Sequence, residues 1–197
     1  MEEIVLASQS QARQEGFRLL GLPFSVVPAM IDESLPPNAD PETAAGILAV
    51  KKAEKVAKRQ GDDGEPPKWV FAADTIIALA GEIFGKPADR GEALQMLSRL
   101  SGKTHLAVTA IALYNGRLGR VDCRRAKCEV SFAELSPAEI GWYLDTGEWR
   151  GAAAGYRIQG AGAGLILSVK GCIGAVAGLP LRDFCVMLKD NGYPYGC

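Results

Sequence analysis

The chain has 197 residues, of which 48% are hydrophobic and 23% are charged, and this ordinary globular balance predicts a single domain over residues 1–197. Its 22 lysines and arginines against 23 aspartates and glutamates give a formal charge of −1, so nucleic-acid polymers and anionic membranes are not expected as partners. No stretch approaches ~18 consecutive apolar residues, so no transmembrane helix is expected.

In the first half of the chain, apolar runs alternate with segments of helical periodicity. In order, we predict a strand at 4–7, a helix at 11–20, a strand at 24–27, a helix at 40–60, a polar loop at 61–68 and a strand at 69–79. Ser10 and Asp40 stand where the N-cap residues of the two helices are expected.

The second half continues this alternation. In order, we predict a helix at 89–100, strands at 105–114 and 119–132, a helix at 136–145, a strand at 165–169 and a helix at 180–189. Asn115-Gly116 is a strong β-hairpin signal, and Ser136 with Glu139 forms a capping box. Alternating strands and helices with one antiparallel hairpin predict an α/β fold with a mixed, twisted sheet and flanking helices.

The cysteines and the single histidine exclude several kinds of site. The cysteines are odd in number, five, and widely spaced, which does not suggest a disulfide framework, so we expect a cytoplasmic protein. Cys123 and Cys128 have no second pair to complete a zinc site. His105 lies in an apolar, strand-like run, which argues against a Ser-His-Asp triad.

Two segments contain groups that suit a phosphorylated ligand and a metal. Between Ser8 and Arg13 a strand ends and a helix begins, so backbone N–H groups, hydroxyls and a guanidinium could face a phosphate. A capped helix with a surface arginine is the alternative. Asp32 and Glu33 are adjacent carboxylates that could help to hold Mg²⁺ or Mn²⁺, or could be solvated loop charges.

Three further positions carry charges that need an explanation. Asp74 lies inside the apolar run 69–79, where an unpaired carboxylate is costly to bury. Metal coordination, action as a base, or hydrogen bonds from backbone amides would each account for it. Lys86, in a Gly-Lys-Pro turn, could reach a polyphosphate or occupy a plain turn. Lys51 and Lys52 would equally suit a ligand or the solvated face of a helix.

Eight short motifs follow one another over nearly the whole chain. They are LASQSQAR from Leu6, Asp32-Glu33, LAVKKA from Leu48, ADT from Ala73, GKP from Gly85, LSGKTH from Leu100, GYRIQG from Gly155 and VAGLPL from Val176. In this order and spacing they resemble the Maf family of nucleoside triphosphate pyrophosphatases. The resemblance implies two lobes around a central cleft, and hydrolysis of a nucleoside triphosphate to monophosphate and pyrophosphate with a divalent cation, Mg²⁺, Mn²⁺ or Co²⁺.

The resemblance also implies roles for individual residues. Asp74 matches the family's proposed base, and Glu33 with Asp74 matches the metal side. The matching substrate-binding positions are Ser8, Arg13, Lys52, Thr75, Lys86 and Gln159. ADT together with IQG resembles the dTTP/UTP-type subgroup, which also acts on modified pyrimidine nucleotides, and Thr75 and Gln159 match positions linked to base selection.

Two positions depart from the family pattern. Ala12 stands where the family has an arginine, and Ala152 where it has a lysine. At about 1.5–3 kcal/mol for each charge-assisted contact, losing both could lower affinity or rate by about a hundredfold or more. Arg157, where the family has a small residue, could restore one charge. The sequence therefore allows a weakened or altered pyrophosphatase, or a non-catalytic paralogue that binds a nucleotide and acts through a partner.

The resemblance also bears on assembly, because related proteins are often dimers. The hairpin around Asn115-Gly116, with the long strand that follows it, is expected to protrude as a ribbon. We therefore expect a homodimer.

Overall fold

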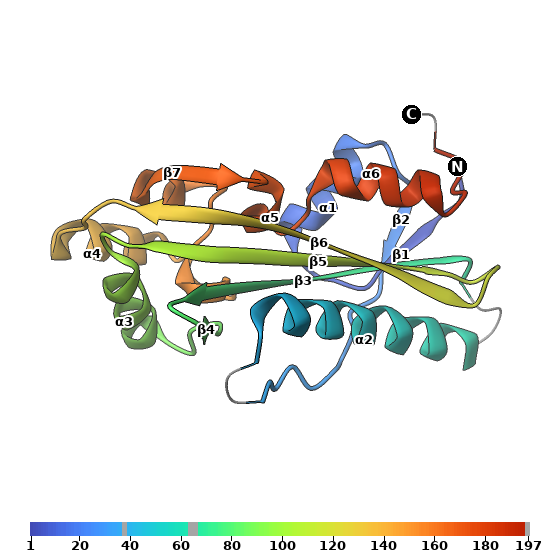
Figure 1. Cartoon of the computed structure of the whole chain (residues 1–197), viewed down its shortest axis with the longest axis horizontal. Coiled ribbons are helices and arrows are strands. Elements are labelled where there is room, and N and C mark those ends of the chain that lie inside the picture. Colours follow the sequence, from blue (N-terminus) through green and yellow to red (C-terminus); the bar gives the residue numbers. More distant parts are fainter. Residues whose placement is uncertain (37–38, 63–66, 196–197) are drawn as a thin grey trace.

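The computed structural model describes residues 1–36, 39–62 and 67–195 of the chain (Figure 1). Within them, the strands are β1 Ile4–Leu6, β2 Phe24–Val26, β3 Trp69–Leu79, β4 Glu82–Phe84, β5 Thr104–Asn115, β6 Arg120–Phe132 and β7 Ile166–Gly171. The helices are α1 Gln11–Leu19, α2 Pro41–Asp62, α3 Arg90–Leu100, α4 Pro137–Thr146, α5 Ile173–Ala177 and α6 Leu181–Asp190, with the 3₁₀ turns η1 Ala153–Gly155 and η2 Ala161–Leu165.

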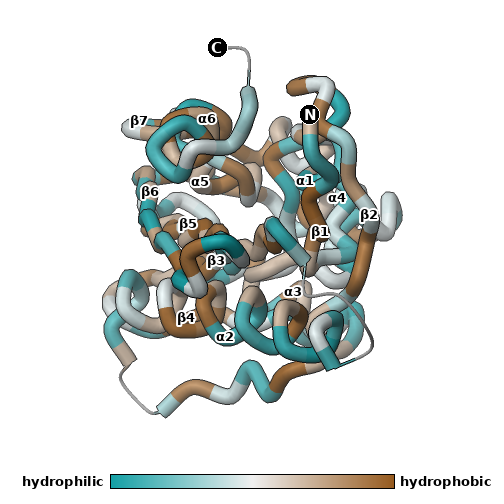
Figure 2. Tube along the Cα trace, turned by 90° about the vertical axis from the view of Figure 1, so that its right-hand side faces the viewer, coloured by the Kyte–Doolittle hydropathy of each residue, from teal (hydrophilic) through white to brown (hydrophobic). Residues whose placement is uncertain are grey.

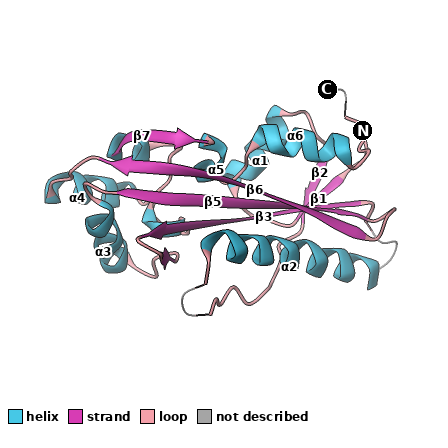
Figure 3. Cartoon of the chain, in the orientation of Figure 1, coloured by secondary structure: helices cyan, strands magenta, loops and turns pink. Residues whose placement is uncertain are grey.

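All of these strands belong to one mixed sheet. Its order is β2-β1-β3-β5-β6-β7, and β4 pairs with β3 beside this path. β1 runs parallel to β2 and β3, whereas the other pairs are antiparallel. The sheet twists along the long strands β5 and β6, and helices flank it (Figure 3). The predicted α/β fold is therefore confirmed.

Helices cover both faces of the sheet in the half that contains the N-terminus. Because β3 is buried on both faces, its successive residues enter two different cores. Phe71 packs against Phe17 of α1 and Phe184 of α6, with ring centroids 5.3 and 4.4 Å apart. Its neighbour Ala72 lies in the opposite core with Ala49 of α2. Figure 2 shows the hydrophobic stretch of β1 between α1 and α6 on one side and α2 on the other.

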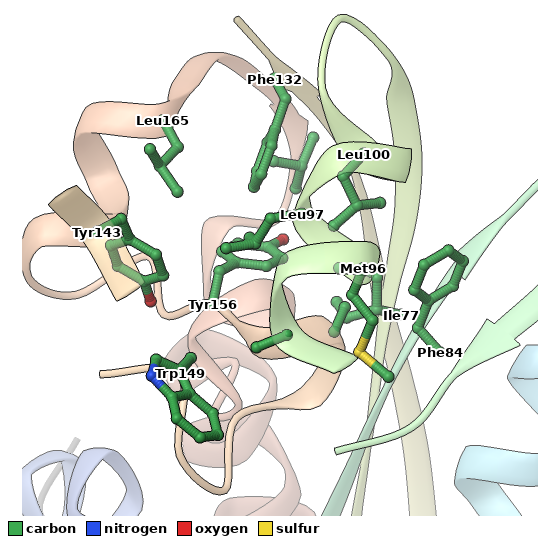
Figure 4. Close-up of a cluster of buried hydrophobic side chains, with 14 of the residues drawn as sticks. Ile77, Phe84, Met96, Leu97, Leu100, Phe132, Tyr143, Trp149, Tyr156 and Leu165 are labelled. Atoms are coloured by element: carbon green, nitrogen blue, oxygen red, sulfur yellow. The ribbon is translucent and has the colours of Figure 1, made fainter. Parts of the chain in front are cut away.

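A third core fills the other half of the molecule and supports the loop after α4 (Figure 4). Leu97 of α3, Phe132 of β6 and Tyr143 of α4 are buried in it together with Tyr156 from that loop. The rings of Phe132 and Tyr156 meet edge to face, with centroids 4.9 Å apart. The loop is therefore held by aromatic packing rather than by regular secondary structure.

The differences from the predicted elements are local. α2 continues to Asp62, two residues into the predicted loop, and the rest of that loop falls partly outside the described residues. Ser10 precedes α1, but its side chain makes no capping hydrogen bond. The short elements β4 and α5 were not predicted, because β4 begins with the charged Glu82 and the five residues of α5 are too few to show a helical period. No helix in the described part of the chain has both the length and the apolar character needed to cross a membrane.

The β5-β6 hairpin does not protrude as a free ribbon, which corrects the expectation from its sequence. Asn115 is only 2% exposed, and its side-chain amide donates a hydrogen bond to the carbonyl of Asn191, just after α6. The N–H of Gly116 donates to the carbonyl of Lys68. The end of the hairpin is thus held by its neighbours in the same chain. The homodimer stays a prediction, but a protruding ribbon no longer supports it.

Candidate active site

A break in strand pairing opens a cleft at one edge of β3. On this edge, β1 pairs with β3 only as far as Leu6 opposite Phe71, and β4 joins β3 only from Ile77 onward. Asp74 and Thr75 lie between these stretches, where none of the described strands covers the edge. Because side chains alternate along a strand, Asp74 faces α2 whereas Thr75 faces α1 and α5.

The cleft over this gap has a volume of about 630 Å³, which is in the range of small-molecule sites. It is lined by every residue to which the resemblance assigns a role: Ser8, Arg13, Glu33, Lys52, Asp74, Thr75, Lys86 and Gln159. Lys86 and Gln159 reach it from the half that holds α3 and α4, and the others reach it from the opposite half or from β3. The predicted arrangement of two lobes around a central cleft is therefore confirmed.

Lys52 joins the two carboxylates expected at the metal side. From the buried face of α2, its Nζ lies 2.5 Å from Oδ1 of Asp74 and 2.6 Å from Oε1 of Glu33. Lys52 and Asp74 are 7% and 8% exposed, so the cost of burying each charge is offset by its partner. The ammonium therefore brings both carboxylates to one point in the cleft.

Glu33 is held between two ammonium groups. Its other carboxylate oxygen lies 3.3 Å from Nζ of Lys86. Burial raises the pKa of Glu33, but the hydrogen bonds and charges of Lys52 and Lys86 outweigh burial and hold this pKa below its usual value. The Glu33 carboxylate is therefore ionised at neutral pH.

Arg13 is held by three different segments of the chain. Its Nη1 donates to Oγ of Ser8 at 2.9 Å, its Nη2 donates to Oγ1 of Thr75 at 3.3 Å, and its Nε donates to the carbonyl of Gly178 at 3.0 Å. Burial lowers the pKa of Arg13, while the carboxylates across the cleft act in the opposite direction. A guanidinium has five N–H donors and stays protonated in proteins, so two donors remain for a ligand.

The loop that carries Gln159 is anchored in the aromatic core of Figure 4. The hydroxyl of Tyr156 lies 2.7 Å from Nε2 of His105, and the backbone N–H of Arg157 donates to the hydroxyl of Tyr143 at 3.2 Å. Burial lowers the pKa of His105 to about 4, so this ring is neutral at pH 7. These contacts fix the loop while the Gln159 side chain stays exposed along the cleft.

Both positions that depart from the family pattern face the cleft. Ala12 lines it from α1 and Ala152 lines it from the glycine-rich loop. Arg157 lines it as well, and its Nε and Nη2 donate to the carbonyls of Glu148 and Arg150 at 2.9 and 2.8 Å. Its guanidinium therefore braces the loop that carries Ala152 and adds a positive charge to this wall.

The donor set suits a hard divalent cation that also binds a phosphorylated ligand. Glu33 and Asp74 offer carboxylate oxygens, and Mg²⁺ is commonly held by one or two carboxylates together with phosphate oxygens and water. Among the described residues, no group of three or more His, Cys, Asp or Glu side chains is arranged to hold a metal alone. A cation bound here would therefore share its coordination with the ligand.

Two charged residues that are next to site residues in the sequence, Asp32 and Lys51, do not line the cleft. Asp32 turns back on its own loop and accepts hydrogen bonds from the N–H and hydroxyl of Ser34, both at 2.9 Å. Lys51 is exposed on α2. Thr109, whose hydroxyl contacts that of Thr75, was not predicted as a site residue. The sequence could have indicated it, because Thr109, like Asp74, is a polar residue inside an apolar run.

Comparison with known proteins finds similar sequences over nearly the whole chain. The family model described as "Maf-like protein" matches residues 3–191. A dTTP/UTP pyrophosphatase of Symbiobacterium thermophilum is 42% identical over 194 residues, which are 98% of this chain and 96% of that protein. Proteins of the same name from Pelotomaculum thermopropionicum and Myxococcus xanthus are 39% and 41% identical, over 98% and 97% of this chain and 98% and 93% of theirs.

Proposed function

Because this chain belongs to the Maf family, we propose that it is a nucleoside triphosphate pyrophosphatase that acts on pyrimidine nucleotides such as dTTP and UTP. Water is added at the bond between the α- and β-phosphates, and the products are a nucleoside monophosphate and pyrophosphate. Relatives that match this chain over almost their whole length and are named dTTP/UTP pyrophosphatase support the substrate class.

The buried pair Asp74–Lys52, joined by the more exposed Glu33, is the observation that carries the proposal. A triphosphate needs cations that neutralise its oxygens as the P–O bond breaks. Lys52 supplies one such cation directly beside Asp74, and Arg13 adds a guanidinium with two free donors in the same cleft. A carboxylate and several cations that meet in one cleft are the groups that pyrophosphate release requires.

In this mechanism Asp74 is the catalytic base. Its carboxylate orients the attacking water and accepts a proton from it, a role that requires the carboxylate to be ionised next to the phosphates. The phosphate oxygens compete with the two carboxylates for Nζ of Lys52. Lys52 therefore moves its hydrogen bonds toward the ligand when the triphosphate binds, which frees Asp74 for the water.

The remaining groups bind and orient the substrate. The proposed substrate-binding residues are Ser8, Arg13, Lys52, Thr75, Lys86 and Gln159. Arg13 and Lys86 offset the charge of the departing pyrophosphate. The amide of Gln159 has both a donor and an acceptor, which match the O4 and N3–H edge of thymine and uracil.

We also propose that a divalent cation, Mg²⁺, Mn²⁺ or Co²⁺, binds between Glu33 and Asp74. Bound there, it would polarise phosphate oxygens and lower the pKa of an attacking water. The two carboxylates converge on one ammonium, which supports this placement.

The compartment is proposed on the state of the thiols. Each described cysteine, Cys123, Cys128, Cys172 and Cys185, is a free thiol. Free cysteines are typical of a reducing compartment, so we propose that the enzyme works in the cytoplasm.

A second candidate function rests on one observation. Ala12 and Ala152 both line the cleft, at positions where the resemblance calls for cations. A paralogue that binds a nucleotide and acts through a partner would tolerate this loss. The buried pair of Lys52 and Asp74 favours the enzyme, because a buried ion pair adds little stability over apolar residues and would not be expected in a chain that makes no use of the charges.

The test is pyrophosphate release by the purified chain. The nucleotides are dTTP, UTP, modified pyrimidine triphosphates, dATP and dGTP, each with Mg²⁺, Mn²⁺ or Co²⁺ and with a chelator control. We expect pyrophosphate from the pyrimidine nucleotides, less from the purine nucleotides, and none with the chelator. Absence of release from every nucleotide with every metal, together with tight nucleotide binding, would favour the non-catalytic paralogue.

A further inference from the structure

A row of hydroxyl groups links Arg13 to the interior of the sheet. Thr75 of β3 and Thr109 of β5 are directly opposite residues of an antiparallel pair, and their Oγ1 atoms lie 2.7 Å apart. Thr109 is fully buried, with 0% exposure. Its Oγ1 lies 2.5 Å from the carbonyl oxygen of Ala175 in α5. The row therefore crosses from the cleft to a short helix on the same face of the sheet.

The direction of each hydrogen bond follows from the carbonyl at the end of the row. A carbonyl can only accept, so Thr109 donates its single hydroxyl hydrogen to Ala175. Thr109 must then accept from Thr75. Because the hydrogen of Thr75 is used in this way, Thr75 accepts from Nη2 of Arg13 and has no hydrogen left for a ligand.

The segment that follows α5 makes a second hydrogen bond with Arg13, in addition to the one with Thr75. α5 has only five residues and is followed by its C-cap residue Gly178, whose carbonyl accepts from Nε of Arg13 at 3.0 Å. A helix this short is not stable through its own hydrogen bonds, so its position depends on its contacts. A Cβ added to Gly178 would lie 3.4 Å from Oγ1 of Thr75, which shows how closely these segments approach. Thr109 therefore affects two of the three bonds that hold the guanidinium.

The hydroxyl of Thr109 is not needed for packing. Valine has nearly the shape of threonine and is equally suited to a strand, so it would fill the same space, but the carbonyl of Ala175 and the hydroxyl of Thr75 would lose this partner. The function of the hydroxyl must therefore lie in its two hydrogen bonds.

We propose that Thr109 is a positioning residue for the triphosphate site, holding the Arg13 guanidinium in place through Thr75 and α5 without contacting the ligand. The inference rests on the proposed function, since that function assigns Arg13 to the phosphates. A guanidinium that is already fixed loses less side-chain entropy on binding, so its two free donors bind a polyphosphate more tightly.

The test compares Thr109→Val with Thr109→Ser, which keeps the hydroxyl. Thr109→Val should raise KM for dTTP and lower kcat/KM about tenfold, whereas Thr109→Ser should stay within about twofold of the wild type. In an Arg13→Lys background, Thr109→Val should add less than about a twofold change, because the group it positions is gone. Thermal unfolding of each variant reports whether it is folded, and Thr109→Ala replaces the valine variant if that variant does not fold.

Two results would overturn the proposal: unchanged kcat/KM in folded Thr109→Val, or an equal loss in the wild-type and Arg13→Lys backgrounds. A merely structural role would lower the melting temperature without raising KM. Calorimetric binding of inorganic pyrophosphate separates this inference from the proposed function. Suppose that the wild type releases no pyrophosphate from dTTP, and that Thr109→Val binds inorganic pyrophosphate more weakly than Thr109→Ser does. The proposed function then fails and the inference stands. If the wild type binds neither ligand, both fail.

Discussion

Asp74 is the side chain on which the proposed chemistry depends most directly. It is 8% exposed, pairs with Lys52, and lies at the open edge of β3. Asp74→Asn keeps the shape but removes the charge and the ability to accept a proton from water. We expect pyrophosphate release from dTTP to fall by at least about a hundredfold, the scale of general-base catalysis, in a protein that still unfolds cooperatively.

The matched control for Asp74→Asn is Asp32→Asn. Asp32 lies in the loop that carries Glu33, but its carboxylate is bound to Ser34 and does not line the cleft. Asp32→Asn should keep activity within about threefold of the wild type, as surface substitutions usually change little. Wild-type turnover by a folded Asp74→Asn variant would make Asp74 a structural residue.

His105 gives the folded chain a pH dependence that can be measured apart from activity. Burial lowers the pKa of His105 to about 4, against an ordinary value of about 6.5. Between these values the unfolded chain binds a proton that the folded chain does not, so the free energy of unfolding decreases as pH falls from about 6.5 to about 4. Over this pH range His105 lowers the free energy of unfolding by about 3 kcal/mol in total, and above pH ~6.5 the effect is absent because the ring is neutral in both states.

The contribution of His105 is isolated with His105→Gln, which keeps an amide near Tyr156 but does not titrate. The free energy of unfolding of both proteins is measured in urea at intervals from pH 7 to pH 4. The carboxylates titrate in both proteins, so their effect cancels in the difference between the two free energies. The stability difference between wild type and variant should shrink as pH falls. A difference that is constant over this range would contradict the prediction.

At the scale of secondary structure, most elements could be predicted, including the three-residue strands β1 and β2, whereas β4 and α5 could not. The apolar run of β3 and the capping box of α4 are local signals, and both elements lie where they were expected. α5 has five residues, and its position depends on contacts with Thr109 and Arg13 from distant parts of the chain. No local pattern contains that information.

The same distinction applies to the site. Charged residues in apolar or turn contexts, such as Asp74 and Lys86, could be identified from the sequence. The hydrogen bonds among them could not, because the pairing of Lys52 with both Asp74 and Glu33 depends on how α2 packs on the sheet. Asp32 and Glu33 are equivalent in the sequence, and only the path of the loop decides that Glu33 faces the cleft.

The walls formed by α1 and the glycine-rich loop allow a test of the missing cations. Ala12 and Ala152 line the cleft from these two elements. We expect Ala12→Arg combined with Ala152→Lys to raise kcat/KM for dTTP at least about tenfold, which corresponds to about 1.4 kcal/mol of transition-state stabilisation. That is less than one good charge-assisted hydrogen bond supplies. The gain should decrease at high salt, because screening weakens long-range attraction.

An arginine added elsewhere shows whether the gain is local to the cleft. Ala138 is exposed on α4 and does not line the cleft, so Ala138→Arg raises the net charge by the same amount as Ala12→Arg. It should leave kcat/KM near the wild-type value. A folded double variant with no gain would mean either that the cleft recognises another ligand, with Arg157 as a contact, or that the site no longer catalyses a reaction.

At the scale of the whole molecule, one sheet supports both walls of the cleft. β3 and β5 run through both halves, so the lobe that carries Gln159 and the lobe that carries Lys52 are not separate units (Figure 1). We therefore expect the chain to work as the single domain that its length and composition predict.

The assembly of two such chains is the last prediction. β7 lies at one end of the sheet, and edge strands offer unpaired backbone groups to another chain. Leu167 on β7 is 73% exposed, and Ile173 at the start of α5 is 62% exposed. A partner chain that pairs along β7 would cover these two side chains. We expect a homodimer that pairs along β7, with about twice the chain mass of 20.9 kDa by light scattering at micromolar concentration.

Two substitutions distinguish this edge from the hairpin as the contact. Leu167→Lys places a charge on β7 and should give a monomer, because a buried unpaired charge opposes association. Leu118 lies in the turn between β5 and β6 and is 56% exposed, so Leu118→Lys should leave the dimer intact. The reverse result would place the contact at the hairpin turn, and a monomeric wild type would exclude the dimer. Because Ile173 belongs to the helix that holds Arg13 through Gly178, a monomeric Leu167→Lys variant with a raised KM for dTTP would mean that dimer formation also supports the ligand site.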